Sequence, residues 1–138
     1  MATRRPFVGG NWKMNTDLAR AVELADDIAA GCRDLVAQCD VAIYPPFPYL
    51  QAVGRTLGHH GLLLGAQDVC HQPNGPFTGE VSVEMLLDLN VRSVLVGHSE
   101  RRNALGEDGD LVNAKARAAL ALRPASQYDC ALFQGLRL

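Results

Sequence analysis

The segment FVGGNWKMN, at positions 7–15, joins a short apolar run to a polar turn. Residues 7–10 have the length and composition of a buried strand that the turn then ends. Asn11 and Lys13 stand at alternate positions, so at a strand end both side chains could point to the same side. A lysine there offers a fixed positive charge to a phosphate or to a developing enolate oxygen. The plain alternative is a solvated lysine after a turn.

Further apolar runs follow, separated by segments with helical periodicity. The predicted strands cover residues 7–10, 41–44, 62–66 and 93–96, and the predicted helices cover 18–32, 50–57, 81–89 and 111–122. Thr16 with Asp17 marks the start of the first helix, and Ser82 opens the third. The inner face of the last helix is expected to consist of Leu111, Ala114, Lys115, Ala118 and Leu122. Four βα units in succession predict an α/β fold with a parallel sheet whose strands are covered on both faces.

This pattern fits an open doubly wound sheet as well as a piece of a (β/α)8 barrel. Asn11, Lys13 and His98 each fall just past the C-terminal end of a predicted strand, where barrel enzymes place catalytic groups. No glycine-rich nucleotide-binding motif occurs at any predicted βα turn, which weakens the doubly wound alternative. The positions of the polar residues therefore favour the barrel.

The segment VGHSERR, at positions 96–102, predicts a strand end that runs into a short helix. A histidine at a helix N-terminus lies near the positive end of the helix dipole, which disfavours the imidazolium form. Taken alone, such a histidine is more often a hydrogen-bonded structural residue. Nearby charges on a short helix are likewise often only solvated.

Composition and charge exclude several classes of protein. The chain has 138 residues, of which 48% are hydrophobic and 20% charged, with a formal net charge of −2. This balance gives no electrostatic reason to expect nucleic acid or a membrane surface as a partner, and no apolar stretch is long enough for a spanning helix. Cys32, Cys39, Cys70 and Cys130 lie far apart, so neither a zinc site nor a disulfide framework is predicted. A cytoplasmic setting is expected.

The two quoted segments resemble the first- and fourth-strand active-site segments of triosephosphate isomerase, and the similarity runs from about residue 5 to residue 120. It implies the first four βα units of a TIM (β/α)8 barrel, which form an incomplete parallel barrel. It also implies a reaction of glycolysis and gluconeogenesis, the interconversion of dihydroxyacetone phosphate and glyceraldehyde 3-phosphate through an enediolate, without cofactor or metal. Asn11 and Lys13 would bind substrate and act in catalysis. His98 would be the neutral electrophile, a role for which this family is the standard example.

The resemblance also assigns supporting residues. Ser99, Glu100 and Arg102 would surround the catalytic groups, with Glu100 and Arg102 as ion-pairing residues and Glu100 close to Lys13. A charged but solvated helix surface is the alternative.

The segment 68–79 is long for a βα loop, and its ending GPFTGE, at positions 75–80, resembles the family's interface loop. In the family this loop inserts into a second subunit and brings a threonine, here Thr78, close to that subunit's Asn11 and Lys13. The expected homodimer interface residues are Gln67, Phe77, Thr78, Gly79 and Glu80. A mobile surface loop is the alternative.

Beyond residue 120 the resemblance ends, so the chain is divided into a half barrel at 1–120 and a divergent tail at 121–138. Pro124 and Ser126 argue against a strand in residues 121–130. The family's general-base glutamate comes from a later segment, beyond the fifth strand. The chain is therefore expected to have little or no activity alone, and to expose sheet edges and much of its inner face. The alternative function is a non-catalytic half barrel that binds phosphate or associates with another subunit.

Overall fold

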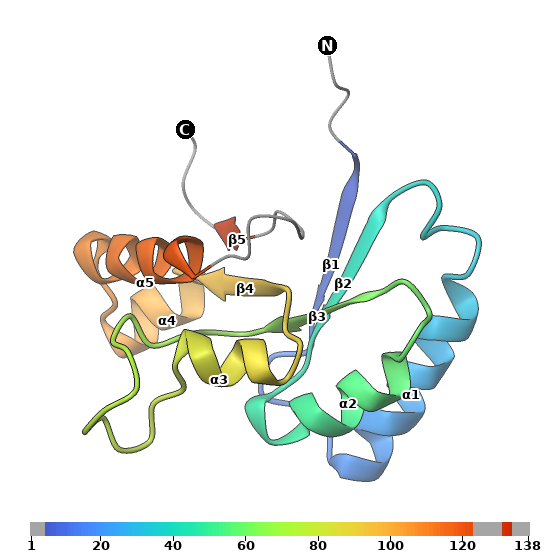
Figure 1. Cartoon of the computed structure of the whole chain (residues 1–138), viewed down its shortest axis with the longest axis horizontal. Helices are drawn as coiled ribbons and strands as arrows, with labels where there is room; N and C mark the ends of the chain where they lie inside the picture. The colour runs from blue at the N-terminus through green and yellow to red at the C-terminus, as the bar shows by residue number, and fades with distance from the viewer. Residues whose placement is uncertain (1–4, 123–130, 134–138) are drawn as a thin grey trace.

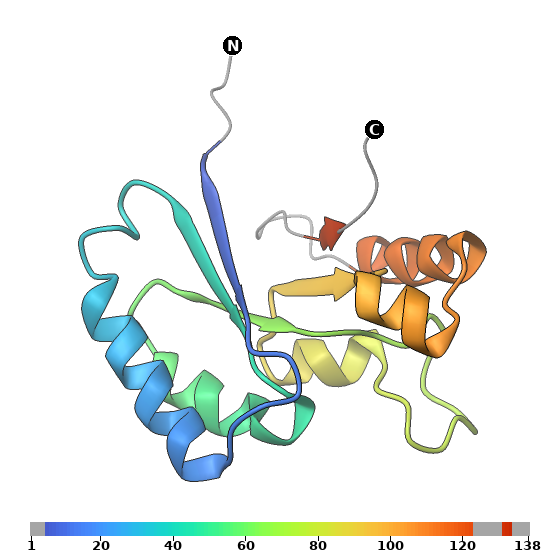
Figure 2. The same ribbon diagram turned by 180° about the vertical axis from the view of Figure 1, so that it is seen from behind.

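A computed structural model describes residues 5–122 and 131–133 of the chain. In order, its elements are β1 (Phe7–Asn11), α1 (Leu18–Gly31), β2 (Asp40–Tyr44), the 3-10 turn η1 (Phe47–Tyr49), α2 (Leu50–Leu57), β3 (Leu63–Ala66), α3 (Val83–Asp88), β4 (Ser93–Val96), α4 (Ser99–Leu105), α5 (Gly109–Ala121) and β5 (Ala131–Phe133). The strands form one parallel sheet in sequence order. Figures 1 and 2 show a curled sheet whose strand direction turns from β1 to β4.

The predicted half barrel is confirmed, because all four predicted strands are present, parallel and followed by helices. The sheet also has a short fifth strand, β5, which pairs with β4 and which the sequence did not predict. Most of the expected tail, including Cys130, lies outside the described residues. In the described part of the chain, no helix is long and apolar enough to cross a bilayer.

Side-chain caps explain where several helices begin. Asp17 accepts a hydrogen bond from the Arg20 amide at 2.9 Å, so α1 begins where the sequence predicted. Ser82 caps α3 in the same way, although that helix is shorter than the predicted 81–89. Asp108 caps α5. Each cap satisfies an amide that has no partner inside its helix.

The main hydrophobic core lies between the sheet and the helices. Its fully buried alanines, Ala21, Ala25 and Ala29, lie along one face of α1 and let that helix pack closely. On α5 the buried residues are Val112, Lys115 and Ala116. The predicted inner face of α5 was therefore partly wrong: the buried stripe is centred nearer Val112, and Leu122 is 43% exposed.

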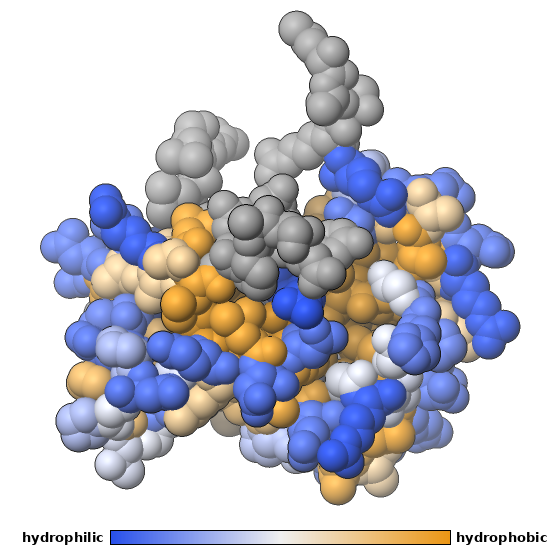
Figure 3. All heavy atoms as spheres, in the orientation of Figure 1, coloured by the Kyte–Doolittle hydropathy of each residue, from blue (hydrophilic) through white to orange (hydrophobic). Residues whose placement is uncertain are grey.

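The other face of the sheet packs around Tyr44, which is fully buried. Its ring lies over Gly65, and its hydroxyl is 2.5 Å from the Ser93 hydroxyl oxygen. Ala42 and Leu95 are also buried there, so the expectation of an exposed apolar inner face was wrong for these residues. At the β1 edge Val8 is 56% exposed, and Figure 3 shows apolar surface gathered near the middle of the face in view.

Gly65→Ala should lower stability by about 1–3 kcal/mol or more, the usual cost of overpacking a filled core. A Cβ atom at this position would lie 2.3 Å from two atoms of the Tyr44 ring, so the ring would have to move and its contact with Ser93 would be lost. Gly31→Ala is the control, because nothing lies within 4 Å of its added Cβ at the end of α1. Urea unfolding of both variants is the measurement, and equal midpoints would contradict the prediction.

Candidate active site

The polar residues singled out in the sequence gather at the carboxyl end of the sheet. Asn11 is the last residue of β1, rather than a residue beyond it, and Lys13 follows two positions later. His98 lies two residues after the end of β4. Parallel strands have their carboxyl ends at the same end of the sheet, so residues from distant parts of the chain meet there.

Lys13 is held by contacts at three of its atoms. Its amide donates to Asn11 Oδ1 at 2.9 Å, its carbonyl accepts from Gln67 Nε2 at 2.8 Å, and its Nζ lies 2.5 Å from Glu100 Oε1. Its φ of 56° is in the left-handed region, which costs about 1–2 kcal/mol for a residue with a side chain. The sequence analysis expected Asn11 and Lys13 to point to the same side as alternate residues of a strand. That explanation was wrong for Lys13, whose position is set by the turn and its hydrogen bonds.

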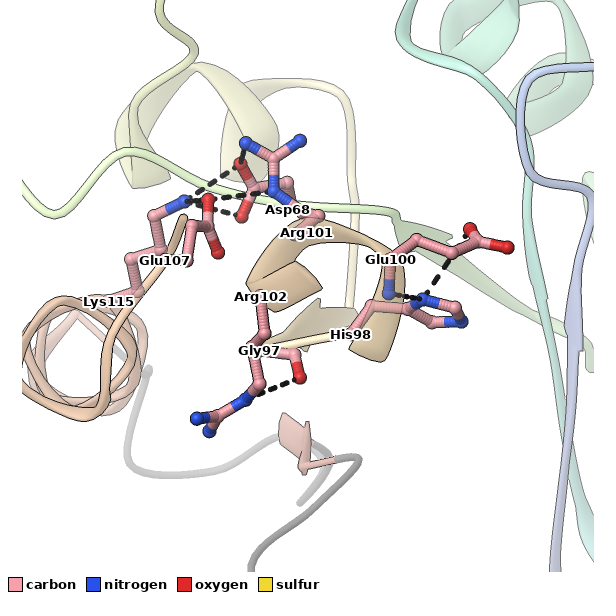
Figure 4. Close-up of polar contacts among 8 residues, drawn as sticks. All are labelled: Asp68, Gly97, His98, Glu100, Arg101, Arg102, Glu107 and Lys115. Carbon is pink, nitrogen blue, oxygen red and sulfur yellow. Dashed lines mark hydrogen bonds and ion pairs between the residues drawn. The ribbon is translucent and has the colours of Figure 1, made fainter. Parts of the chain in front are cut away.

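His98 is the N-cap residue of α4, and its side chain is only 11% exposed. The Glu100 amide donates to His98 Nδ1 at 3.2 Å (Figure 4). The ring accepts this hydrogen bond only when Nδ1 carries no proton, so the contact favours the tautomer with its proton on Nε2. The Nε2–H group is then the donor that the ring can offer to a ligand.

The Glu100 carboxylate connects the two candidate groups. One oxygen contacts Lys13 Nζ at 2.5 Å, and the other lies 3.5 Å from His98 Nδ1. The expected proximity of Glu100 to Lys13 is thus found. The hydrogen bond from Lys13, together with its charge, lowers the pKa of the Glu100 carboxyl, although the side chain is 56% exposed.

Lys13→Met should raise the titration midpoint of Glu100. A carboxyl whose pKa is lowered by folding stabilises the fold above its ordinary pKa, and that contribution is lost as the pH falls through the folded value. The Lys13–Glu100 pair should therefore persist into more acidic solution than an ordinary glutamate would allow. Carboxyl ¹³C shifts followed against pH measure this, with Arg55→Met on α2 as a control. An unchanged Glu100 midpoint in Lys13→Met would contradict the prediction.

The other supporting residues are placed differently from one another. Arg102 was expected to form ion pairs, but its Nε donates to the Gly97 carbonyl at 2.9 Å, and it is Arg101 that pairs with carboxylates. Ser99 is the first residue of α4 and is exposed. Gly97 has a φ of 66°, and an added Cβ would lie 2.8 Å from Val112, so the turn into α4 requires glycine.

The expected interface residues fall into two groups. Phe77, Thr78, Gly79 and Glu80 form the exposed tip of the loop, and Phe77 is 41% exposed. Gln67 instead points to the site, where its Nε2 donates to the carbonyls of Lys13 and Tyr44, both at 2.8 Å. The interface role of all five remains a prediction.

Gln67→Met should loosen the turn that carries Lys13 and cost about 1–2 kcal/mol, the usual range for lost hydrogen bonds. The Tyr44 carbonyl keeps a bond from the Trp12 amide at 3.1 Å, so the loss falls mainly on Lys13. Gln51→Met, at an exposed position of α2, is the matched control. Urea unfolding and the Lys13 amide resonance are the measurements. A shift no larger than that of the control would refute the role of Gln67.

Sequence reasoning missed a cluster of four charged residues beside the site, named here the charge cluster: the buried Asp68, Glu107 and Lys115 and the half-buried Arg101. Lys115 Nζ lies 2.8 Å from Asp68 Oδ1 and 2.5 Å from Glu107 Oε1. Arg101 contacts the same two carboxylates at 3.0 and 2.8 Å. The available signal was a lysine within the apolar stripe of α5, since a buried lysine requires a partner.

Burial raises the pKa of a carboxyl group and pairing with a cation lowers it, and both effects act on Asp68 and Glu107. Burial raises the pKa of Asp68 and outweighs its bonds to Lys115 and Arg101. Burial also acts to raise the pKa of Glu107, but hydrogen bonds from Lys115 and Arg101 outweigh it and lower that pKa. Asp68 follows a strand end, but it is turned towards Lys115 and away from His98 (Figure 4).

The sequence analysis considered the cysteines as possible disulfide or metal-binding residues. Cys32, Cys39 and Cys70 are free thiols. Across residues 5–122 and 131–133, no group of three or more His, Cys, Asp or Glu side chains is arranged to hold a metal ion.

The successive parallel βα units, with a lysine and a histidine at the carboxyl end of the sheet, define part of a (β/α)8-barrel protein. A family model described as triosephosphate isomerase matches residues 6–125, slightly beyond the predicted limit of 120. The chain therefore belongs to the triosephosphate isomerase family.

Curated relatives agree with this assignment. The chain is 41% identical over 118 residues to "Triosephosphate isomerase" of Thermoanaerobacter sp. (strain X514). The aligned region covers 86% of this chain and 47% of the relative. It is 45% identical over 123 residues to the protein of the same name from Chloroflexus aurantiacus. That aligned region covers 88% of this chain and 49% of the relative. The chain thus spans about half the length of the curated relatives it matches.

Proposed function

We propose that this chain carries the N-terminal half of a triosephosphate isomerase active site. Asn11 and Lys13 bind the phosphorylated triose, and His98 polarises its carbonyl group. The observation that supports this most directly is the Glu100 carboxylate, which contacts both Lys13 and the ring of His98. The Lys13 ammonium group and the His98 imidazole therefore lie close together at the carboxyl end of the sheet.

The reaction moves a proton between adjacent carbons. A base removes a proton from the hydroxyl-bearing carbon next to the carbonyl, and negative charge develops on the carbonyl oxygen. The hydroxyl proton then passes from one oxygen of the enediolate to the other, and the base returns its proton to the former carbonyl carbon, so that the first carbon becomes the new carbonyl. His98 Nε2–H donates a hydrogen bond to the carbonyl oxygen, and the charge of Lys13 stabilises the enediolate or the phosphate. Because both groups are held before substrate arrives, little reorganisation is needed as the charge develops.

The proton-transfer step needs a base that we assign to a second segment. Glu100 is paired with Lys13, and Asp68 and Glu107 are engaged in the charge cluster. A general base must come within hydrogen-bond reach of the carbon-bound proton. We therefore propose that a polypeptide of residues 1–138 binds the substrate but converts it poorly unless the other half of the barrel is supplied.

The proposal extends to assembly. The exposed loop tip around Phe77, together with Met14, which is 95% exposed, supports a homodimer in which this loop contacts a second subunit. The proposed setting is the cytoplasm, and the proposed division of the chain is a half barrel at 1–120 and a divergent tail at 121–138.

Binding of 2-phosphoglycolate, a carboxylate analogue of the enediolate, tests the proposed function. In nuclear magnetic resonance titrations the Lys13 and His98 signals should shift, and Lys13→Met should abolish the saturable shift. Arg55→Met removes an exposed cation from α2 and should leave binding unchanged. Saturable binding that survives Lys13→Met, or no binding by a folded wild-type chain, would overturn the proposal.

A further inference from the structure

The helix that carries the candidate site has no hydrophobic anchor. None of the seven residues of α4 (Ser99–Leu105) is buried, and its largest apolar side chain, Leu105, is 65% exposed. Isolated helices shorter than about 12–15 residues are marginal in water, and most helices in proteins are held by an apolar face. Polar contacts must therefore hold α4 in place.

Those contacts come mainly from Arg101. Its Nη2 lies 3.0 Å from Asp68 Oδ2, and its Nε lies 2.8 Å from Glu107 Oε1 (Figure 4). A planar guanidinium that reaches two carboxylates fixes orientation as well as distance. The Glu107 amide also donates to the Arg101 carbonyl at 3.3 Å.

The other three members of the charge cluster are buried. Asp68, Glu107 and Lys115 are 7%, 6% and 4% exposed, respectively. Lys115 Nζ contacts both carboxylates, and the three residues come from the loop after β3, from the α4–α5 connection and from α5. The charge cluster thus ties α4 to these three parts of the fold through two basic and two acidic side chains.

We propose that the charge cluster is the device that orients α4 and thereby sets the ring of His98, with Arg101 and Lys115 as positioning residues. Arg101 is the neighbour of Glu100, whose amide fixes the His98 tautomer and whose carboxylate reaches Lys13. A rotation of α4 would move both groups of Glu100 together. The importance of this for catalysis rests on the proposed function, but the orientation itself does not.

The tautomer of His98 tests this proposal without any measurement of turnover. Long-range ¹⁵N–¹H correlation spectra distinguish a ring protonated at Nε2 from a mixture of tautomers, and His98→Asn assigns the signal among the four histidines. The wild-type chain should show the single Nε2–H form. Arg101→Met and Lys115→Met should convert it to a mixture and shift the Glu100 amide, whereas Arg117→Met, on the exposed face of α5, should do neither.

Folding is monitored in each sample by circular dichroism. If Arg101→Met does not fold, Arg101→Lys decides the question, because it keeps the charge but loses the two-pronged contact. A His98 ring that stays in the single Nε2–H form in folded Arg101→Lys would show that the charge cluster stabilises the chain without setting the site. That result would overturn the inference and would leave the proposed function standing, since substrate binding is measured separately.

Discussion

A polypeptide of residues 1–138 is expected to isomerise glyceraldehyde 3-phosphate at least about 10⁴-fold more slowly than a complete enzyme of the family. General acid–base catalysis typically contributes about 10²- to 10⁴-fold, and loss of substrate positioning adds to that cost. In the proposed site Lys13 and His98 stabilise the enediolate, and the base that removes the carbon-bound proton is assigned to another segment.

A coupled assay of purified chain measures this directly. Lys13→Met is the control for the chemistry, because any genuine turnover that uses this site should depend on its charge. Adding the C-terminal half of the Chloroflexus aurantiacus relative as a second polypeptide should restore part of the rate if the two halves assemble. Rapid turnover by residues 1–138 alone, abolished by Lys13→Met, would show that these residues contain a general base of their own, contrary to the prediction.

Lys115→Met is expected to lower the free energy of unfolding by about 3–5 kcal/mol, the usual cost of removing one partner from a buried ion pair. Methionine keeps most of the length of the side chain, so the main change is the lost charge. Asp68 and Glu107 would then share Arg101 as their partner within the charge cluster. Native domains are stable by only about 5–15 kcal/mol, so the variant should be close to unfolding.

Urea unfolding measures the loss, and Arg117→Met on the exposed face of α5 should change stability by less than about 0.5 kcal/mol.

Replacing each carboxylate of the charge cluster by the amide of the same shape gives a second test. Because the pKa of Asp68 is raised and that of Glu107 is lowered, folding favours the neutral form of the first and the charged form of the second. Near neutral pH, Asp68→Asn should therefore cost less than Glu107→Gln. The reverse order, or a Lys115→Met variant as stable as the control, would refute this account.

Much of the fold followed from local signals in the sequence. The strands β2, β3 and β4 are nearly continuous apolar runs, and the start of α1 was marked by Asp17, which caps the helix as expected. The position of Lys13 and His98 at one end of the sheet followed from the topology alone, since each lies two residues beyond the end of a parallel strand.

Features that depend on tertiary contacts were not predictable in this way. The strand β5 has three residues, too few to show a periodicity, and it exists through its pairing with β4. Lys115 was assigned correctly to the inner face of α5, but its partners, Asp68 and Glu107, lie 47 and 8 residues away in the sequence. The left-handed backbone of Lys13 likewise depends on a glutamine that follows a different strand.

The order of the sheet has a consequence for how the chain folds. Each strand pairs with the strand that precedes it in the sequence, from β1 through β5. A chain emerging from a ribosome can therefore add each new unit to an edge that is already formed, without waiting for later segments. The contact between Lys13 and Glu100 spans 87 residues and closes only after three such additions. The scaffold is thus assembled first, and the site is completed late during synthesis.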